Sequence, residues 1–253
     1  MTTCPKCGYQ RQASDRSTHA GICPSCGIAY AKYRPPAAAS AAVSENPAVL
    51  DSEIIELVSF RQRLFNTVTH IPEHTDSTAF YGRAALFGIF VLWGASFMIA
   101  GIDWEKIGGS FLHNVNLAFH EFGHVLFGPF GRFMAILGGS LFQVLFPLVF
   151  VVAFSLQMRD NFAASICLWW CGQSFIDVSP YIADAPYRVL PLIGGLGEES
   201  HDWGNLLTMT NSVDSAPTLA NLSFGIGVVI MLVSFAWGGA ILRLQYRALN
   251  GEH

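Results

Sequence analysis

The chain has 253 residues, of which 52% are hydrophobic and 13% are charged, and its mean hydropathy is +0.40. A soluble domain carries about 25% charged residues, so this composition excludes an ordinary soluble protein and indicates a membrane protein. The net charge of −4 and the lack of a basic stripe argue against nucleic acid as the main partner.

Two Cys-Pro-x-Cys-Gly turns, at residues 4–8 and 23–27, stand near the start of the chain. Each turn presents two thiolates, and two such turns close a tetrahedral zinc site. Paired C-x-x-C turns favour a metal over two disulfides. We therefore predict that residues 1–33 form a small domain around a structural zinc ion, with four ligands: Cys4, Cys7, Cys23 and Cys26.

This first region resembles the short zinc ribbons at the N-termini of bacterial proteins. The resemblance rests on the two cysteine turns, on Arg11 and Gln12 after the first, and on Tyr30, Ala31 and Lys32 after the second. It implies a zinc-ribbon domain, and we expect such a domain to recruit or orient a protein partner.

Residues 34–50 are rich in Pro and Ala and show no apolar periodicity, which predicts a flexible linker. Residues 51–83 form a juxtamembrane segment that contains a predicted amphipathic helix, with Arg61 and Arg63 on its polar side. The pattern fits a helix on the membrane surface and equally a short helix packed on the ribbon. The apolar side carries Ile54, Leu57, Val58, Leu64, Phe65 and Val68.

Residues 84–253 are predicted to form an all-α polytopic membrane domain. Its five hydrophobic segments span 84–102, 109–127, 133–158, 162–183 and 216–242. A bilayer crossing needs about 20 apolar residues, so each segment approaches or exceeds that length. The number of full crossings stays open at this point.

The orientation of the chain is predicted from its arginines. Arg61, Arg63 and Arg83 precede the first segment and, with a thiolate zinc site, favour a cytoplasmic N-terminus. We expect a multi-pass protein of the bacterial inner membrane. Five crossings would place Arg243 and Arg247 outside, against the positive-inside rule, so the side of the C-terminus stays open.

The second hydrophobic segment contains His-Glu-Phe-Gly-His at residues 120–124. On a helix, His120 and His124 share one face and can bind a single metal ion, while Glu121 can take a proton from metal-bound water. Ionisable residues are costly at membrane depth, which predicts a functional site.

A catalytic zinc ion has three protein ligands and one open position, so a third ligand must come from later in the chain. We select Asp184, because its helix is expected to run parallel to the H-E-x-x-H helix and to end near the same membrane face. His201 and Asp202 remain alternatives, either as the ligand or as hydrogen-bond partners of the two histidines. The other candidates are Asp177, Glu198 and Glu199.

The chain resembles the site-2 protease class of intramembrane zinc metalloproteases. The resemblance covers about residues 84–190 and rests on the H-E-x-x-H pentad and on Pro180 and Asp184 two apolar segments later. The family's second element typically reads N-x-x-P-x-x-x-x-D-G, and its aspartate is the third zinc ligand. Here Asp177 replaces the asparagine, the spacing is one residue shorter and Ala185 replaces the glycine.

The predicted function is a zinc metalloendopeptidase that cleaves a transmembrane or membrane-adjacent protein, with Glu121 as the catalytic base. The alternative is a non-catalytic scaffold or sensor that binds zinc at both sites. Three protein ligands and a water favour hydrolysis, whereas four protein ligands favour a structural ion. A transporter is less favoured, because the hydrophobic segments carry few carboxylates.

Overall fold

The computed structural model describes residues 3–32, 60–72, 76–192, 195 and 197–251. The chain divides into two compact units, Met1–Leu57 and Val58–His253. Within the described residues all regular elements are helices, and extended pairing is limited to two isolated bridges, Thr3 with Gln10 and Ile22 with Ala29. The predicted linker at 34–50 lies outside the described residues.

In the first unit, both cysteine turns are closed in the same way. The backbone N–H of Gly8 donates to the Cys4 carbonyl, and that of Gly27 to the Cys23 carbonyl, each at 3.0 Å. These glycines have φ values of 70° and 72°, a left-handed conformation that side chains disfavour. The final glycine of each motif is therefore required by the turn. Short 3₁₀ helices follow at Ala13–Ser17 and Tyr30–Lys32.

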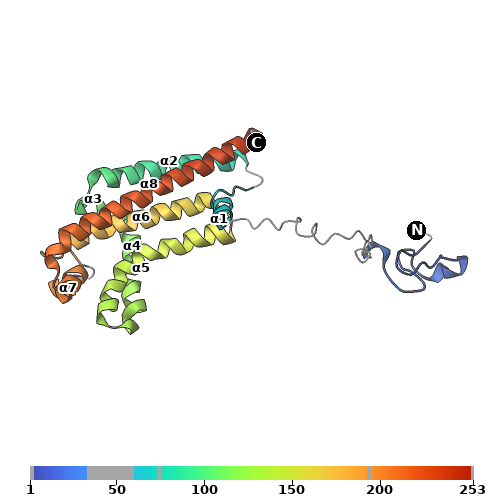
Figure 1. Cartoon of the computed structure of the whole chain (residues 1–253), viewed down its shortest axis with the longest axis horizontal. Helices are drawn as coiled ribbons and strands as arrows, with labels where there is room; N and C mark the ends of the chain where they lie inside the picture. Colours follow the sequence, from blue (N-terminus) through green and yellow to red (C-terminus); the bar gives the residue numbers. More distant parts are fainter. Residues whose placement is uncertain (1–2, 33–59, 73–75, 193–194, 196, 252–253) are drawn as a thin grey trace, which may run out of the picture. The chain divides into compact units, whose positions relative to one another are not determined.

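The second unit is built from eight α-helices in its described part (Figure 1). They are α1 (Phe60–Val68), α2 (Ser77–Ala100), α3 (Trp104–Gly108), α4 (Phe111–Phe127), α5 (Arg132–Val152), α6 (Asn161–Ala183), α7 (Asp202–Met209) and α8 (Ala216–Leu249). A π-helical turn, Ala153–Gln157, extends α5. Single 3₁₀ turns lie at Gly128–Phe130, Glu198–Ser200 and Val213–Ser215.

All five predicted hydrophobic segments are helical, as α2, α4, α5, α6 and α8. In the described part of the chain, three stretches are long and apolar enough to cross a membrane: Ser77–Ala100, Arg132–Gln157 and Val213–Leu249. The segments seen as α4 and α6 are not among these three stretches, each for its own reason. Helix α4 has 17 residues, and α6 buries polar side chains such as Gln173 and Asp177.

Helix α2 begins earlier than the predicted boundary at residue 84. The Asp76 side chain caps it by accepting from the Thr78 N–H at 3.0 Å. Arg83 therefore lies inside the helix, where its guanidinium donates to the Asp160 carboxylate at 2.7 Å. This ion pair compensates the charge of Arg83, the residue directly before the predicted start of the segment.

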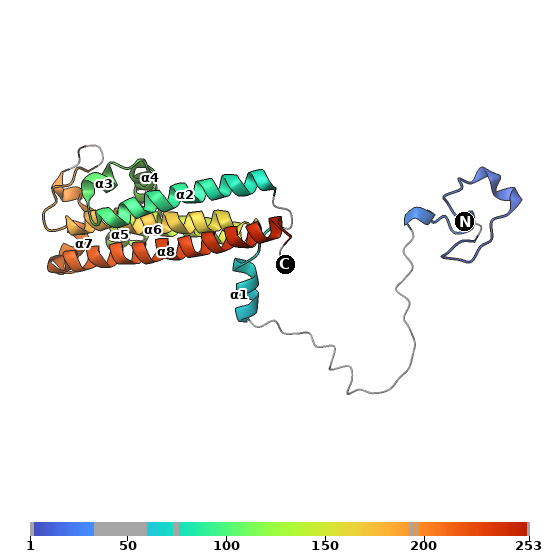
Figure 2. The same cartoon turned by 90° about the horizontal axis from the view of Figure 1, so that it is seen from above.

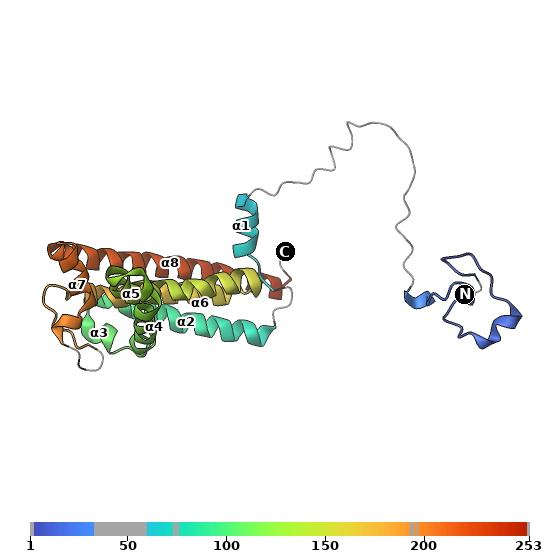
Figure 3. The ribbon, with the colours of Figure 1, turned by 90° about the horizontal axis from the view of Figure 1, so that it is seen from below.

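Helix α6 is the centre of the unit and packs against α8, α5 and α2. Helices α2, α6 and α8 lie side by side along the long axis of this unit (Figures 1 and 2). Helices α6 and α8 approach closely at Gly172, where an added Cβ would lie 2.8 Å from the Gly227 carbonyl oxygen. Helices α3 and α7 lie at one end of the unit, and α1 lies at the other (Figure 3).

Candidate metal centre

The H-E-x-x-H pentad lies on α4, as its spacing predicts. Ser110 caps the helix by accepting from the Leu112 N–H at 3.3 Å. His120 is buried and His124 is half-buried, and their ring centroids are 4.8 Å apart. Glu121 is exposed and lines the same cavity as both imidazoles. The local sequence therefore brings the two imidazoles together without help from the rest of the fold.

The hydrogen bonds of the two imidazoles determine which ring nitrogens can bind a metal. His124 Nδ1 lies 2.8 Å from the Ala135 carbonyl oxygen, which can only accept, so Nδ1 carries the proton. His120 Nδ1 lies 3.1 Å from Oε1 of Gln143. In each neutral ring the unprotonated Nε2 then points away from these partners and keeps its lone pair.

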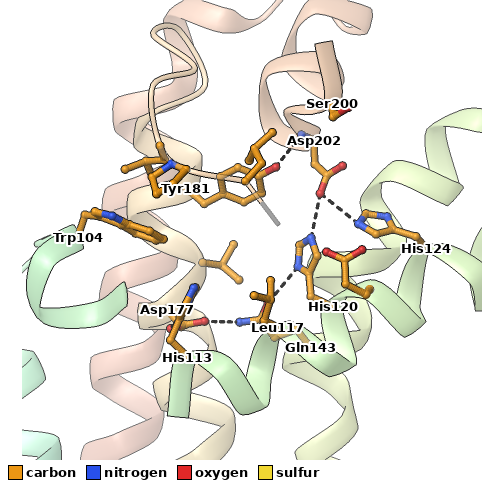
Figure 4. Close-up of a pocket in the computed structure, with 15 residues that line it drawn as sticks. Trp104, His113, Leu117, His120, His124, Gln143, Asp177, Tyr181, Ser200 and Asp202 are labelled. Carbon is orange, nitrogen blue, oxygen red and sulfur yellow. Dashed lines mark hydrogen bonds and ion pairs between the residues drawn. The ribbon is translucent and has the colours of Figure 1, made fainter. Parts of the chain in front are cut away.

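The orientation of the Gln143 amide is set by a carboxylate. Its Nε2 donates to Oδ2 of Asp177 at 2.7 Å, which leaves Oε1 for His120. The other oxygen of Asp177 lies 3.1 Å from Nδ1 of His113. A chain of hydrogen bonds thus runs from His113 of α4 to Asp177 of α6, then to Gln143 of α5 and back to α4 at His120 (Figure 4).

The third member of the centre is Asp202, the first residue of α7. Its Oδ2 lies 2.8 Å from Nε2 of His120 and 3.2 Å from Nε2 of His124 (Figure 4). The Asp202 N–H donates to the Tyr181 hydroxyl at 2.8 Å, which holds the start of α7 over α4. Burial raises the pKa of Asp202, but hydrogen bonds that the imidazoles donate from Nε2 when protonated, together with their charge, outweigh burial and lower it. A metal ion would take the place of these Nε2 protons. The carboxylate is therefore ionised.

Asp184, the third ligand predicted from the sequence, is not part of this group. It caps the end of α6, accepts from the Leu190 N–H at 2.9 Å and contacts Nε2 of His201 at 3.2 Å. His201 Nδ1 accepts from the Gly204 N–H at 2.9 Å, so both of its ring nitrogens are engaged. Asp184 and His201 together support the loop that presents Asp202.

Three donor atoms thus converge on one point, and they could hold a metal ion. One nitrogen from each of His120 and His124 and one carboxylate oxygen of Asp202 lie within 4.8 Å of one another. Gly139 of α5 leaves the space beside them, because a Cβ there would lie 2.6 Å from Nε2 of both histidines. Any side chain at this position would intrude on the donor atoms.

A cavity of about 220 Å³ opens onto these atoms. Its wall is formed by α4 and α6, by Trp104 of α3 and by the loop before α7 (Figure 4). The apolar part of its lining is Trp104, Leu117, Val178, Leu190, Pro191 and Leu192. The polar part of its lining is His113, His120, Glu121, His124, Gln143, Asp177, Tyr181, Ser200 and Asp202. The cavity can therefore receive an apolar chain beside a reactive centre.

A second group of candidate ligands lies in the first unit. The sulfur atoms of Cys4, Cys7, Cys23 and Cys26 all lie within 4.8 Å of one another, and none forms a disulfide. Burial raises the pKa of Cys23, but backbone N–H groups of Cys26 and Ser25 outweigh it and bring the pKa to about 6. The turn thus favours a thiolate at Cys23, the form that binds a metal. At Cys26 the backbone N–H of Ile28 lowers the pKa, but burial and the neighbouring cysteines outweigh it and raise the pKa to about 11.

Several residues of the centre do not stand out in the sequence. Gln143 is a single polar residue in an otherwise uncharged run, which is a signal that the sequence carries. Ala135 acts through its carbonyl and Gly139 through its missing side chain, so neither leaves a chemical signature. Tyr181 lies between Pro180 and Asp184, and only these two neighbours were selected from the sequence.

No family model, curated protein or solved structure matches this chain.

Proposed function

We propose that the chain is a membrane-embedded zinc metalloendopeptidase of the site-2 protease type. The observation that carries this proposal is the convergence of His120, His124 and Asp202 on one point beside Glu121 and a cavity. The three stretches long enough to cross a membrane support the location. Asp202 replaces Asp184 as the proposed third ligand.

The distances between the donor atoms support zinc. In a tetrahedral site with metal bonds of about 2.0–2.1 Å, neighbouring ligand atoms are about 3.3 Å apart. The distance from His124 Nε2 to Asp202 Oδ2 is 3.2 Å, and that from His120 Nε2 is 2.8 Å. The His124 distance matches the tetrahedral spacing, and the His120 distance would have to lengthen by a few tenths of an ångström.

The number of ligands favours an enzyme over a scaffold or sensor. Among the described residues, the group has two histidines and one carboxylate, with no fourth His, Cys, Asp or Glu. Three protein ligands leave one position for water, as in catalytic zinc sites. In contrast, the four cysteines form a closed set, for which we propose a structural zinc ion.

The chemistry follows from the residues around the cavity. Bound zinc would lower the pKa of a water ligand and polarise the scissile carbonyl. Glu121 lines the cavity, and its carboxylate makes no hydrogen bond to another residue in the described part of the chain. It is therefore free to accept a proton from water and to return it to the leaving amine. Gln143 and the Ala135 carbonyl keep both imidazoles oriented during this cycle.

The proposed substrate is a transmembrane or membrane-adjacent segment of another protein. A helical amide is shielded by its own hydrogen bonds, so the segment must unwind locally before it is cleaved. The apolar wall of the cavity would receive its side chains. We place the protein in the bacterial inner membrane with the ribbon in the cytoplasm, where the ribbon would recruit or orient a protein partner.

The structural zinc ion is supported by sulfur distances. Tetrahedral zinc with Zn–S bonds of about 2.3 Å separates its sulfur atoms by about 3.8 Å. Cys4 and Cys26 are 3.8 Å apart, and Cys7 and Cys23 are 3.7 Å apart. The sulfur atoms of these two pairs are thus spaced as zinc requires, and all four lie within 4.8 Å of one another.

Glu121→Gln tests the enzymatic proposal. In a protein whose four ribbon cysteines are replaced by serine, we expect one zinc ion per chain, retained in Glu121→Gln and lost in His120→Ala. Cells that express the full-length enzyme should produce cleaved membrane-protein fragments that disappear with Glu121→Gln. New protein N-termini in the membrane fraction provide the readout.

Glu105→Gln is the matched control, because this exposed glutamate of α3 removes the same charge without lining the cavity. It should leave both zinc content and cleavage unchanged. If Glu121→Gln generated the same fragments at the normal rate, Glu121 would not be the base and the peptidase proposal would fail.

A further inference from the structure

A second cavity, of about 390 Å³, lies between α1 and the end of α5. Its lining includes Arg63 and His70 from the α1 region and Ser155 and Arg159 from the end of α5. Helix α1 is held there by hydrogen bonds from Asn161 to the Thr67 and His70 carbonyls, at 2.7 and 2.9 Å. The cavity thus belongs to the end of the unit that carries α1 (Figure 3).

Two residues that line this cavity each have a buried polar atom with no hydrogen-bond partner in the described structure. The two atoms are the Ser155 hydroxyl, in a residue that is 8% exposed, and Nδ1 of His70. An unpaired buried polar group costs about 1–3 kcal/mol, so such groups are usually satisfied by a ligand or water. Ser155 lies in the π-helical turn Ala153–Gln157, a distortion often found at functional sites.

The charge of the cavity identifies the kind of ligand. Neither the Arg63 nor the Arg159 guanidinium forms an ion pair within the described ranges, although both line the cavity. The nearest carboxylate in sequence, Asp160, is engaged by Arg83 at 2.7 Å. Two arginines, a hydroxyl and an imidazole form a set of donors that suits a phosphate group, because guanidinium forks match its oxygens.

The surroundings of the cavity favour a lipid as the source of this phosphate. On α1, Leu64 and Phe65 are 52% and 63% exposed, and beyond α5, Leu156 and Met158 are 60% and 67% exposed. Apolar side chains beside arginines are typical of helices at the membrane surface. We propose that this cavity binds the headgroup phosphate of an anionic phospholipid, whose acyl chains lie along these apolar side chains. The proposal does not depend on the peptidase activity.

Lipid binding by the purified full-length protein tests this site. Native mass spectrometry in a neutral detergent would compare bound phosphatidylglycerol with bound phosphatidylcholine. We expect the double variant Arg63→Gln/Arg159→Gln to weaken phosphatidylglycerol binding at least about tenfold, since hydrogen bonds to charged groups are among the strongest. Ser155→Ala should weaken it about threefold or more, because it removes one donor.

Arg247→Gln is the matched control, because it removes the same charge from an exposed arginine of α8 that does not line the cavity. It should bind phosphatidylglycerol within about twofold of the unaltered protein, the small change expected for a single exposed charge. Equal losses in Arg247→Gln and in the double variant would mean non-specific attraction and would overturn the site.

Inorganic phosphate and glycerol phosphate distinguish the two sources of the ligand. We expect phosphatidylglycerol to raise the unfolding temperature of the unaltered protein but not of the double variant. Inorganic phosphate or glycerol phosphate at the same concentration should give a smaller rise. An equal rise with phosphate alone would assign the cavity to a free anion and overturn the lipid.

Discussion

Two aspartates near the metal centre have different tasks. Asp202 contacts both pentad imidazoles, at 2.8 and 3.2 Å. Asp184 contacts His201, which caps the helix that Asp202 begins. The same residue type therefore supplies a donor atom at one position and supports a loop at the other.

Exchanging each aspartate in turn should separate these tasks. In the protein without ribbon cysteines, Asp202→Ala should abolish binding of the remaining zinc ion. Asp184→Asn should keep the zinc ion but lower the free energy of unfolding by about 1–3 kcal/mol, the cost of a weakened buried hydrogen-bond network. Zinc content and urea unfolding measure the two effects. Loss of zinc in Asp184→Asn alone would instead make Asp184 the ligand.

Gln143 orients His120, so its loss should weaken metal binding without removing a ligand. Gln143→Leu should raise the zinc dissociation constant about 10–100-fold, the usual effect of removing the partner of a ligating histidine. Gln173→Leu is the control, since Gln173 accepts from the Asn116 side chain at 2.8 Å in the same protein interior without touching His120. Competition with a zinc chelator measures both.

A double exchange provides the rescue. Gln143→Glu alone places two carboxylates at hydrogen-bonding distance and should destabilise the fold. Adding Asp177→Asn restores the pairing of donors with acceptors, because the carboxylate introduced at position 143 can then accept from both His120 and the new amide at position 177. We expect zinc affinity within about threefold of that of the unaltered protein, because residues in one hydrogen-bond network couple directly. Failure to recover would show that the chain of hydrogen bonds does not orient His120.

At the level of elements, the approach of α5 to α4 shapes the centre. Gly139→Ala should abolish or strongly weaken zinc binding, because the added Cβ would lie 2.6 Å from Nε2 of both histidines. Gly88→Ala in α2 makes the same change where no atom lies within 4 Å and should leave binding unchanged. Zinc content after purification distinguishes them, and equal zinc in both variants would contradict this role of α5.

The helices themselves were largely predictable from the sequence. Long apolar runs predicted the helices now seen as α2, α4, α5, α6 and α8, because hydrophobicity over many residues is a local property. The start of α2 is marked locally by the Asp76 cap, but the predicted segment began only after the charged Arg83, whose partner Asp160 is far away in the chain. The amphipathic helix is seen as α1 only over Phe60–Val68, and residues 51–59 lie outside the described structure.

For the whole molecule, the four cysteines all lie within residues 4–26, so the first unit should bind zinc by itself. A peptide of residues 1–34 should fold when zinc is added and unfold when a chelator removes it, because metal binding supplies the folding free energy. Circular dichroism and zinc titration measure this. Cys26→Ser is the control that should not fold, and a peptide that stays unfolded with zinc would contradict the proposal.

Features that depend on nearby residues could be predicted from the amino-acid sequence alone. Both imidazoles and Glu121 follow from a spacing of four on one helix, and the cysteine turns follow from two short motifs whose glycines adopt left-handed conformations. Their donor atoms are placed by a single local conformation, so no distant residue is needed to predict them.

The residue that joins the two imidazoles could be identified only from the packing of the helices. Asp184 ends an apolar segment, whereas Asp202 follows a polar, glycine-rich loop, so the local pattern favoured Asp184. The choice depends on Tyr181 and His201, which hold the start of α7 over α4 and direct one carboxylate toward the imidazoles. Side-chain contacts between segments about 80 residues apart carry this information, and no local pattern encodes it.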